Sequence, residues 1–308
     1  MANIKELSKI PERLVSGHRL CSGCGASIVA RQVLMGTTTP VVVGAATGCL
    51  EVATTIYPYT AWNTPYIHNA FENVAATISG VETAYRALKK QGKIKKDIKF
   101  VAFGGDGGTY DIGLQSLSGA LERGHDFVYV CYDNEAYMNT GIQRSSATPV
   151  GASTTTAPAG KASYGKTQIR KDLTAIVAAH HVPYAASGSV SHWNDLVTKS
   201  QKAFAVKGPA FLNVFALCHR GWRYPQADGI KIAKLAVDTG FWPLIEFENG
   251  KWRFTFKPKE RKPVVEFLKT QGRFKHLFKA ENKPVLEEIQ KNVDTHWEYL
   301  EKLAQATA

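Results

Sequence analysis

The chain has 308 residues and a formal net charge of +12, with 44% hydrophobic and 21% charged residues. A chain of this length and composition buries a substantial core, so it needs neither a metal nor a disulfide merely to fold. No apolar run reaches the roughly 18 residues that a membrane span requires, so we expect a protein that does not act in a membrane.

The cysteines and the charge narrow the expected setting. No apolar segment marks residues 1–11 as a secretion signal, so we expect a cytoplasmic protein whose five cysteines bind metal or do chemistry. Basic residues are dense in 89–99 and 251–279. No RNA-binding or helix-turn-helix signature accompanies them, so a solvated face is favoured over nucleic-acid binding. An acidic electron-carrier protein is the specific alternative.

Strand and helix patterns alternate along the chain. Helical patterns cover residues 73–90, 113–122, 173–179 and 193–206, and short apolar runs typical of buried parallel strands cover 40–45, 99–104, 127–132 and 210–215. This alternation predicts an α/β fold with a mostly parallel central sheet flanked by helices. In such sheets, ligands bind beyond the carboxyl ends of the strands.

The character of the chain changes twice. Residues 148–167 are rich in Gly, Ser, Thr and Pro without periodicity, which indicates a long functional or disordered loop. After residue 238, Asn249-Gly250 predicts a hairpin, basic segments follow, and a charged helix is expected from about 283 to 304. We therefore predict two parts, residues 1–237 and a C-terminal extension of residues 238–308 that packs on the core or on a partner.

Four cysteines form a pattern that suits an iron–sulfur cluster. Cys21 and Cys24 form a CxxC, whereas Cys49 and Cys218 stand alone in glycine-rich or polar turns. A 4Fe–4S cluster usually takes four thiolates, and two can come from anywhere in the fold. Structural zinc is the rival, but it usually takes a second CxxC. For Cys131, inside an apolar run, simple burial is favoured.

A second pattern predicts a diphosphate held through magnesium. Asp106 lies in Gly105-Asp106-Gly107 at an expected strand end, and Asn134 follows the next strand. Asp106, Asn134 and the Ala136 carbonyl would supply oxygen ligands, which Mg²⁺ prefers, while the glycines expose backbone amides to phosphate. A lone Gly-Asp-Gly is a common turn, but together with Asp133-Asn134 at this spacing it is typical of thiamine diphosphate enzymes.

These motifs together resemble one family, the 2-oxoacid:ferredoxin oxidoreductases. The resemblance is to their β subunit, which binds thiamine diphosphate and a cluster, and the pyruvate enzymes (pyruvate synthases) are the most similar group. It runs from His18 to about Tyr224, and five stretches carry it: residues 18–25, 105–113, 133–141, 143–149 and 221–225.

The resemblance implies a thiamine diphosphate-binding fold and a role for each motif residue. Cys21, Cys24, Cys49 and Cys218 would hold the 4Fe–4S cluster, and Asp106, Asn134 and Ala136 would hold Mg²⁺. Asn139 would point towards the substrate carbon and is the candidate catalytic residue. The residues expected to touch the thiamine cofactor are Ala26, Cys49, Gly105, Asp106, Gly107, Gly108, Asn134, Glu135, Ala136, Tyr137, Met138 and Asn139.

The activity implied is reversible, coenzyme A-dependent oxidative decarboxylation of pyruvate to acetyl-CoA and CO2, with electrons passed through the cluster to ferredoxin. The glutamate that activates the cofactor in this family has no candidate here, and no Cys-x2-Cys-x2-Cys-x3-Cys run occurs. The implied partners are therefore α, γ and ferredoxin-like subunits or their fusions.

Two rival functions remain at this point. The same cofactor machinery acts on 2-oxoisovalerate, 2-oxoglutarate or oxalate in related enzymes. From another class, the chain would be an iron–sulfur electron-transfer subunit without thiamine chemistry, although the spaced Asp106 and Asn134 argue against it.

Overall fold

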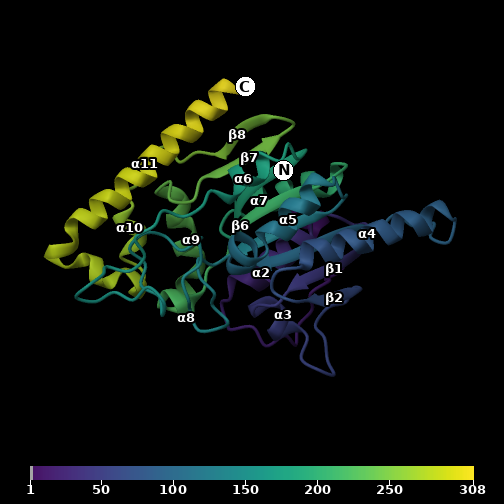
Figure 1. Ribbon diagram of the computed structural model, residues 1–308, viewed down its shortest axis with the longest axis horizontal. Helices are drawn as coiled ribbons and strands as arrows, with labels where there is room; N and C mark the ends of the chain where they lie inside the picture. The colour runs from purple at the N-terminus through teal and green to yellow at the C-terminus, as the bar shows by residue number, and fades with distance from the viewer. Residues whose placement is uncertain (1–2) are drawn as a thin grey trace.

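The computed structural model describes residues 3–308, and one sheet runs through them (Figure 1). Its strands are β1 (Val41–Ala46), β2 (Tyr66–Asn69), β3 (Lys99–Gly105), β4 (Val128–Asp133), β5 (Tyr184–Ser189), β6 (Ala210–Phe215), β7 (Leu244–Glu248) and β8 (Lys251–Phe256). Their order is β2-β1-β3-β4-β6-β5-β7-β8. The first six are parallel, β7 is antiparallel to β5, and β8 is antiparallel to β7.

Helices cover both faces of this sheet. They are α1 (Ile4–Leu7), α2 (Gly25–Leu34), α3 (Cys49–Thr54), α4 (Val74–Lys90), α5 (Leu114–Glu122), α6 (Leu173–Ala178), α7 (Trp193–Ala205), α8 (His219–Trp222), α9 (Gly229–Asp238), α10 (Val265–Leu268) and α11 (Lys283–Ala306). Shorter turns are a π-helix (Gly107–Ile112) and 3₁₀ segments at Gln226–Asp228, Gly272–Phe278 and Ala280–Asn282. Within residues 3–308, no helix combines the length and the apolar character needed to cross a membrane.

Alternate residues of each strand pack into two separate hydrophobic cores, because side chains alternate between the faces of a sheet. In β3, Val101 and Phe103 pack with the apolar faces of α2, α7 and α9. Phe100 and Ala102 of the same strand pack with α4, α5 and α6 on the opposite face. The result is a three-layer α/β arrangement, which confirms the predicted fold class.

The sequence predicted four of the six parallel strands and missed β2 and β5. β5 reads Tyr-Ala-Ala-Ser-Gly-Ser, so it lacks the branched apolar residues that mark a buried strand. Its small residues have a packing reason, since a Cβ on Gly188 would lie 2.8 Å from Leu196 of α7. β2 is a short, partly exposed edge strand. Residues 148–167 contain only isolated bridges, in agreement with the predicted long loop.

The C-terminal extension continues the sheet through a hairpin. Asn249 and Gly250 both have positive φ, 50° and 86°, as the predicted Asn-Gly turn requires. Figure 1 shows α11 (yellow) lying along the β7–β8 side of the molecule. The ring centroids of Phe254 of β8 and Trp297 of α11 lie 4.7 Å apart, with the rings tilted by 42°. Trp252 is buried as well. These aromatic residues are therefore used inside the chain, and the division at residue 238 stays a prediction.

The core at Phe103 is the first point to test. Replacing this fully buried ring by alanine should lower the free energy of unfolding by about 3–5 kcal/mol, the usual cost of such a cavity. Phe278, which is 42% exposed, is the matched control, and Phe278→Ala should cost less than about 1 kcal/mol. Urea unfolding followed by circular dichroism measures both, and equal losses would contradict the layer assignment.

Candidate active site

Four neighbouring strands bring the candidate ligands to one edge of the sheet. β1, β3, β4 and β6 are adjacent and parallel, so their carboxyl ends meet at the same edge. Asp106 directly follows β3 and Asn134 directly follows β4, whereas Cys49 and Cys218 come three residues after β1 and β6. The sequence pattern predicted this placement for Asp106 and Asn134.

The glycines around Asp106 are explained by close packing. After β3 the chain enters a π-helix, a form often found at functional sites. A Cβ on Gly107 would lie 2.4 Å from the Tyr137 ring, and one on Gly113 would lie 2.1 Å from the Gly108 carbonyl oxygen. Only glycine fits at these two positions, so the backbone of this turn remains close to the cleft.

Three oxygen atoms from the two turns face one another. As oriented in the structure, Asn134 Oδ1 lies 2.9 Å from Asp106 Oδ1 and 2.8 Å from the Ala136 carbonyl oxygen. Without a cation these oxygens repel, and a flipped amide would donate to both of them instead. Around Mg²⁺, octahedral ligands at about 2.1 Å are themselves about 3 Å apart. The three atoms therefore fit a magnesium ion when the amide oxygen faces inward.

This ligand set contains a single carboxylate. Among residues 3–308, no three His, Cys, Asp or Glu side chains are grouped to hold one metal ion. An amide and a backbone carbonyl lie outside such a group, yet both are hard oxygen donors that suit Mg²⁺.

Asp106 is buried without a cationic partner. It is 1% exposed and accepts hydrogen bonds from the Ser145 hydroxyl at 2.5 Å and the Asn134 backbone amide at 3.3 Å. Burial, and then the nearby Asp133, raise its pKa well above the usual range. Within residues 3–308 it forms no ion pair with Lys or Arg, so a bound cation would offset both effects.

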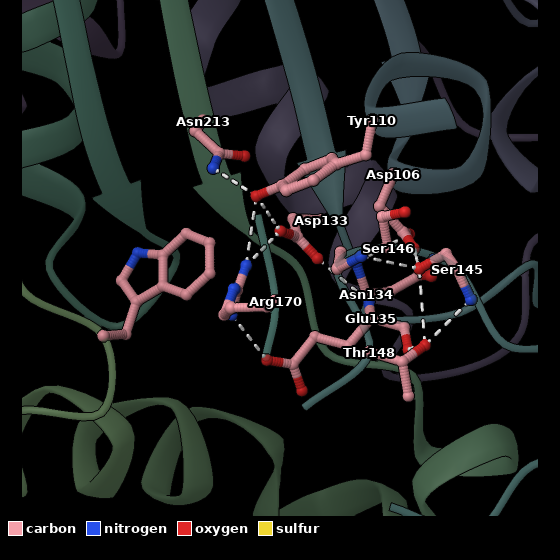
Figure 2. Close-up of polar contacts among 12 residues, drawn as sticks. Asp106, Tyr110, Asp133, Asn134, Glu135, Ser145, Ser146, Thr148, Arg170 and Asn213 are labelled. Atoms are coloured by element: carbon pink, nitrogen blue, oxygen red, sulfur yellow. Dashed lines mark hydrogen bonds and ion pairs between the residues drawn. The ribbon is translucent and has the colours of Figure 1, made fainter. Parts of the chain in front are cut away.

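The neighbouring carboxylates have the partners that Asp106 lacks. Figure 2 shows Asp133 and Glu135 facing Arg170, on the other side of the turn from Asp106 and Ser145. Arg170 bonds Asp133 Oδ2 at 2.7 Å and Glu135 Oε1 at 3.0 Å. Burial raises the pKa of Asp133 to about 6, and Arg170 opposes this shift. Arg170 thus neutralises Asp133 and Glu135, whereas Asp106, which faces the cleft, has no cationic partner among residues 3–308.

The predicted cluster cysteines lie close enough to affect pKa values within the set: those of Cys24, Cys49 and Cys218 are each raised in part by other cysteines. Cys21 is exposed, while Cys24, Cys49 and Cys218 are half-buried and no cysteine forms a disulfide. Burial raises the pKa of Cys24 to about 11, and Cys218 and Cys21 add to the shift. Burial raises the pKa of Cys49 to about 12, with Cys24 and Cys218 again adding. Such thiols lose their proton readily only when a metal replaces it.

Within residues 3–308 these cysteines are not grouped tightly enough to hold a single metal ion, and two local features bear on the predicted cluster. The Gly221 backbone amide donates to Cys218 Sγ at 3.3 Å, which is the kind of contact that stabilises a metal-bound thiolate. Gly23 has φ 76°, so the CxxC turns sharply. Cys131 is fully buried inside β4, as predicted for a structural cysteine.

A narrow cleft contains Cys49 and the predicted magnesium ligands. It is lined by Thr47, Gly48, Cys49, Phe71, Gly105, Asp106, Gly107, Gly108, Tyr132, Asn134, Ala136, Tyr137, Met138, Asn139 and Thr140. Asn139 also hydrogen-bonds the Cys49 thiol, which lowers the burial-raised pKa of that thiol. The cleft thus contains one of the predicted cluster cysteines, Cys49, together with the three predicted magnesium ligands.

Two residues predicted to touch the cofactor do not line this cleft. Ala26 is buried in the first turn of α2, and the Glu135 side chain is held by arginines behind the turn. Conversely, five residues that line the cleft were not predicted: Thr47, Gly48, Phe71, Tyr132 and Thr140. Tyr132 could not be recognised because it lies within the apolar run of β4. In the structure its hydroxyl is buried without a hydrogen-bond partner.

A larger cavity of about 180 Å³ lies between α11, residues 169–174 and residues 240–245. Arg170 and Asn213 reach it, but none of the candidate ligands does. Size alone therefore does not identify the site, and we assign the chemistry to the narrower cleft because Asp106 and Cys49 lie there.

Comparison with known proteins identifies the family. The profile described as "Thiamine pyrophosphate enzyme, C-terminal TPP binding domain" matches residues 43–214, which run from β1 to β6. Pyruvate synthase subunit PorB of Thermotoga maritima is 56% identical, covering 99% of this chain and 97% of that protein. The chain belongs to the 2-oxoacid:ferredoxin oxidoreductase family. The resemblance inferred from the motifs is thereby confirmed.

Other members agree with this assignment. PorB of Methanocaldococcus jannaschii is 53% identical over 92% of this chain and 94% of that protein. Ketoisovalerate oxidoreductase subunit VorB of Pyrococcus furiosus is 47% identical over 98% and 97%. A chain of the 2-oxoglutarate:ferredoxin oxidoreductase from Magnetococcus marinus shares the fold, with a TM-score of 0.54 and 19% identity over 70% and 76% of the two chains.

The site generates a prediction about cofactor affinity. Asp106→Ala removes the only carboxylate of the set, so the affinity for Mg²⁺ with thiamine diphosphate should fall more than about 100-fold, because even outer-shell partners of a metal are worth about 10–100-fold. Asn134→Ala should have a smaller effect, since the charged ligand remains. Titration calorimetry measures both, with exposed Asp97→Ala as the control. Full cofactor occupancy in Asp106→Ala would refute the site.

Proposed function

We propose that this chain is the β subunit of a pyruvate synthase and binds thiamine diphosphate, Mg²⁺ and a 4Fe–4S cluster. With its partner subunits it catalyses the reversible, coenzyme A-dependent oxidative decarboxylation of pyruvate to acetyl-CoA and CO2, with ferredoxin as electron acceptor. The observation that carries this proposal is the cleft between Asp106 and Cys49, in a chain 56% identical to a pyruvate synthase subunit over almost its whole length.

The chain's own residues have defined tasks in this proposal. Asp106, Asn134 and the Ala136 carbonyl would hold Mg²⁺, and the Gly105–Gly108 backbone amides would bind the diphosphate. Bound thiamine diphosphate supplies the nucleophilic carbon and the electron sink for decarboxylation. Asn139, which lines the cleft beside Cys49, orients the substrate carbon between the two cofactors.

The cysteines hold the electron acceptor next to this site. Cys21, Cys24, Cys49 and Cys218 bind the cluster, and their unpaired thiols are in accord with a reducing cytoplasm. Because Cys49 lines the cleft itself, a cluster held there would lie beside the thiamine diphosphate site and would supply the electron acceptor.

Partner subunits complete the enzyme. This chain offers no candidate for the activating glutamate and has no ferredoxin-like cysteine run. We therefore propose that α, γ and ferredoxin-like subunits, separate or fused, supply these parts, bind coenzyme A and relay electrons to ferredoxin.

A second substrate deserves a direct comparison. The VorB relative at 47% identity makes 2-oxoisovalerate the principal alternative to pyruvate. The purified assembly should reduce methyl viologen fastest with pyruvate and coenzyme A in a panel of 2-oxoacids. A faster rate with 2-oxoisovalerate would reassign the substrate. Absence of reduction, together with no thiamine released on denaturation, would favour the electron-transfer subunit instead.

The cluster assignment predicts a difference between two cysteines. Cys49→Ser should lower the iron content and the rate of acceptor reduction, because the cluster loses one of its four thiolates. Cys131→Ser should retain the parent's iron, because this residue is buried in β4 away from the cleft. Iron analysis of the two purified assemblies measures the contrast. Equal iron in both variants would sink the assignment.

A further inference from the structure

The turn that carries two of the proposed magnesium ligands has an unusual backbone. Glu135, between Asn134 and Ala136, has φ 65°, a left-handed conformation that favours glycine or asparagine. A glutamate there is strained, and such strain persists only where the surroundings hold it. The direction of this turn sets where the Asn134 side chain and the Ala136 carbonyl point.

Every polar atom of Glu135 takes part in a hydrogen bond. Its backbone N–H donates to Asp133 Oδ1 at 3.0 Å, and its carbonyl accepts from Thr148 Oγ1 at 2.6 Å. Its fully buried carboxylate accepts from Arg170 at 3.0 Å and from Arg273 at 2.5 Å. The side chain, which points away from Asp106, thus pins the strained turn from behind (Figure 2).

Arg273 comes from the C-terminal extension, 138 positions further along the chain. Its side chain is 3% exposed, and its Nε donates to Gln271 Oε1 at 2.9 Å. The guanidinium lies 3.9 Å from the centroid of the Trp222 ring. Gln271 and Trp222 therefore hold the Arg273 side chain in place, so that its guanidinium is rigid where it contacts Glu135.

Trp222 connects Arg273 to the same turn through a second contact. The Trp222 indole N–H donates to the Asn134 carbonyl at 2.8 Å. Trp222 ends α8, the short helix that directly follows Cys218. The stacked pair therefore touches the turn both through the Glu135 carboxylate and through the Asn134 carbonyl.

We propose that Arg273 is a positioning residue: it keeps Glu135 left-handed and so orients the Asn134 and Ala136 oxygens towards the metal. This role rests on the proposed function, since it presumes that these oxygens bind Mg²⁺. It makes the C-terminal extension part of the cofactor site without contact between Arg273 and the cofactor. Arg273 reaches the ion only through Glu135 and Trp222.

The test compares Arg273→Met with a matched control in the same extension. Arg261 also pairs with a carboxylate, Asp294 at 2.7 Å, and lies 5.1 Å from the Trp297 ring centroid. Within residues 3–308 Arg261 forms no hydrogen bond or ion pair with residues 133–141, so Arg261→Met should leave the turn unchanged. Both variants are made in the full chain and purified with its partner subunits.

Two readouts separate positioning from general loss of structure. In Arg273→Met, amide hydrogen exchange of the peptide 133–141 should accelerate in the cofactor-free assembly. The affinity for Mg²⁺ with thiamine diphosphate should fall about 10–100-fold, as expected for an outer-shell partner, while the iron content stays at the parent's level. Arg261→Met should match the parent in all three measurements.

A double-variant cycle tests the route through Glu135. Glycine adopts a left-handed turn without help, so Arg273→Met should cost clearly less affinity in a Glu135→Gly background than in the parent, and the loss that remains measures the contact through Trp222. The same loss in both backgrounds, or unchanged exchange in Arg273→Met, would overturn the proposal. If Arg273→Met fails to fold, Arg273→Lys keeps the charge but not the planar fork, and unchanged exchange there is equally decisive. A parent assembly without thiamine diphosphate affinity would refute the proposed function, whereas the exchange comparison would still decide whether Arg273 holds the turn.

Discussion

The site depends on a buried carboxylate that the chain itself does not neutralise. Asp106 stands at the end of β3, is 1% exposed, and receives hydrogen bonds only from the neutral Ser145 and Asn134 among residues 3–308. A buried charge without a partner is costly, so such a group is neutralised by a proton or by a cation. A cation would also need the Asn134 amide oxygen to face Asp106 and the Ala136 carbonyl, whereas a flipped amide would donate to both of them.

The surrounding arginines pair with other carboxylates and leave Asp106 without a cationic partner among residues 3–308. Arg170 and Arg273 occupy the back of the Asn134–Ala136 turn and neutralise Asp133 and Glu135 there, so neither arginine forms an ion pair with Asp106. The parallel strands β1 and β6 then bring Cys49 and Cys218 to the same edge. Sheet topology thus brings the residues of two proposed cofactor sites, which lie far apart in sequence, to one edge.

Much of this arrangement could be predicted from the sequence, and the failures have physical reasons. The runs around Val41, Val101, Val128 and Leu212 are apolar because these strands are buried on both faces, and the ligand motifs follow them directly. β5 was missed because its small residues serve the packing of α7 rather than strand propensity. Tyr132 and Arg273 were missed because their roles arise from contacts across the fold, which no local pattern encodes.

The most direct test of this account is an anomalous X-ray map of the intact assembly, collected at the iron edge from anaerobically grown crystals. The account predicts a compact iron peak bounded by the sulfurs of Cys21, Cys24, Cys49 and Cys218. In the same crystals, an octahedral ion should lie between Asp106, Asn134 and the Ala136 carbonyl, next to a diphosphate. A zinc signal at the cysteines, or a diphosphate bound away from Asp106, would contradict it.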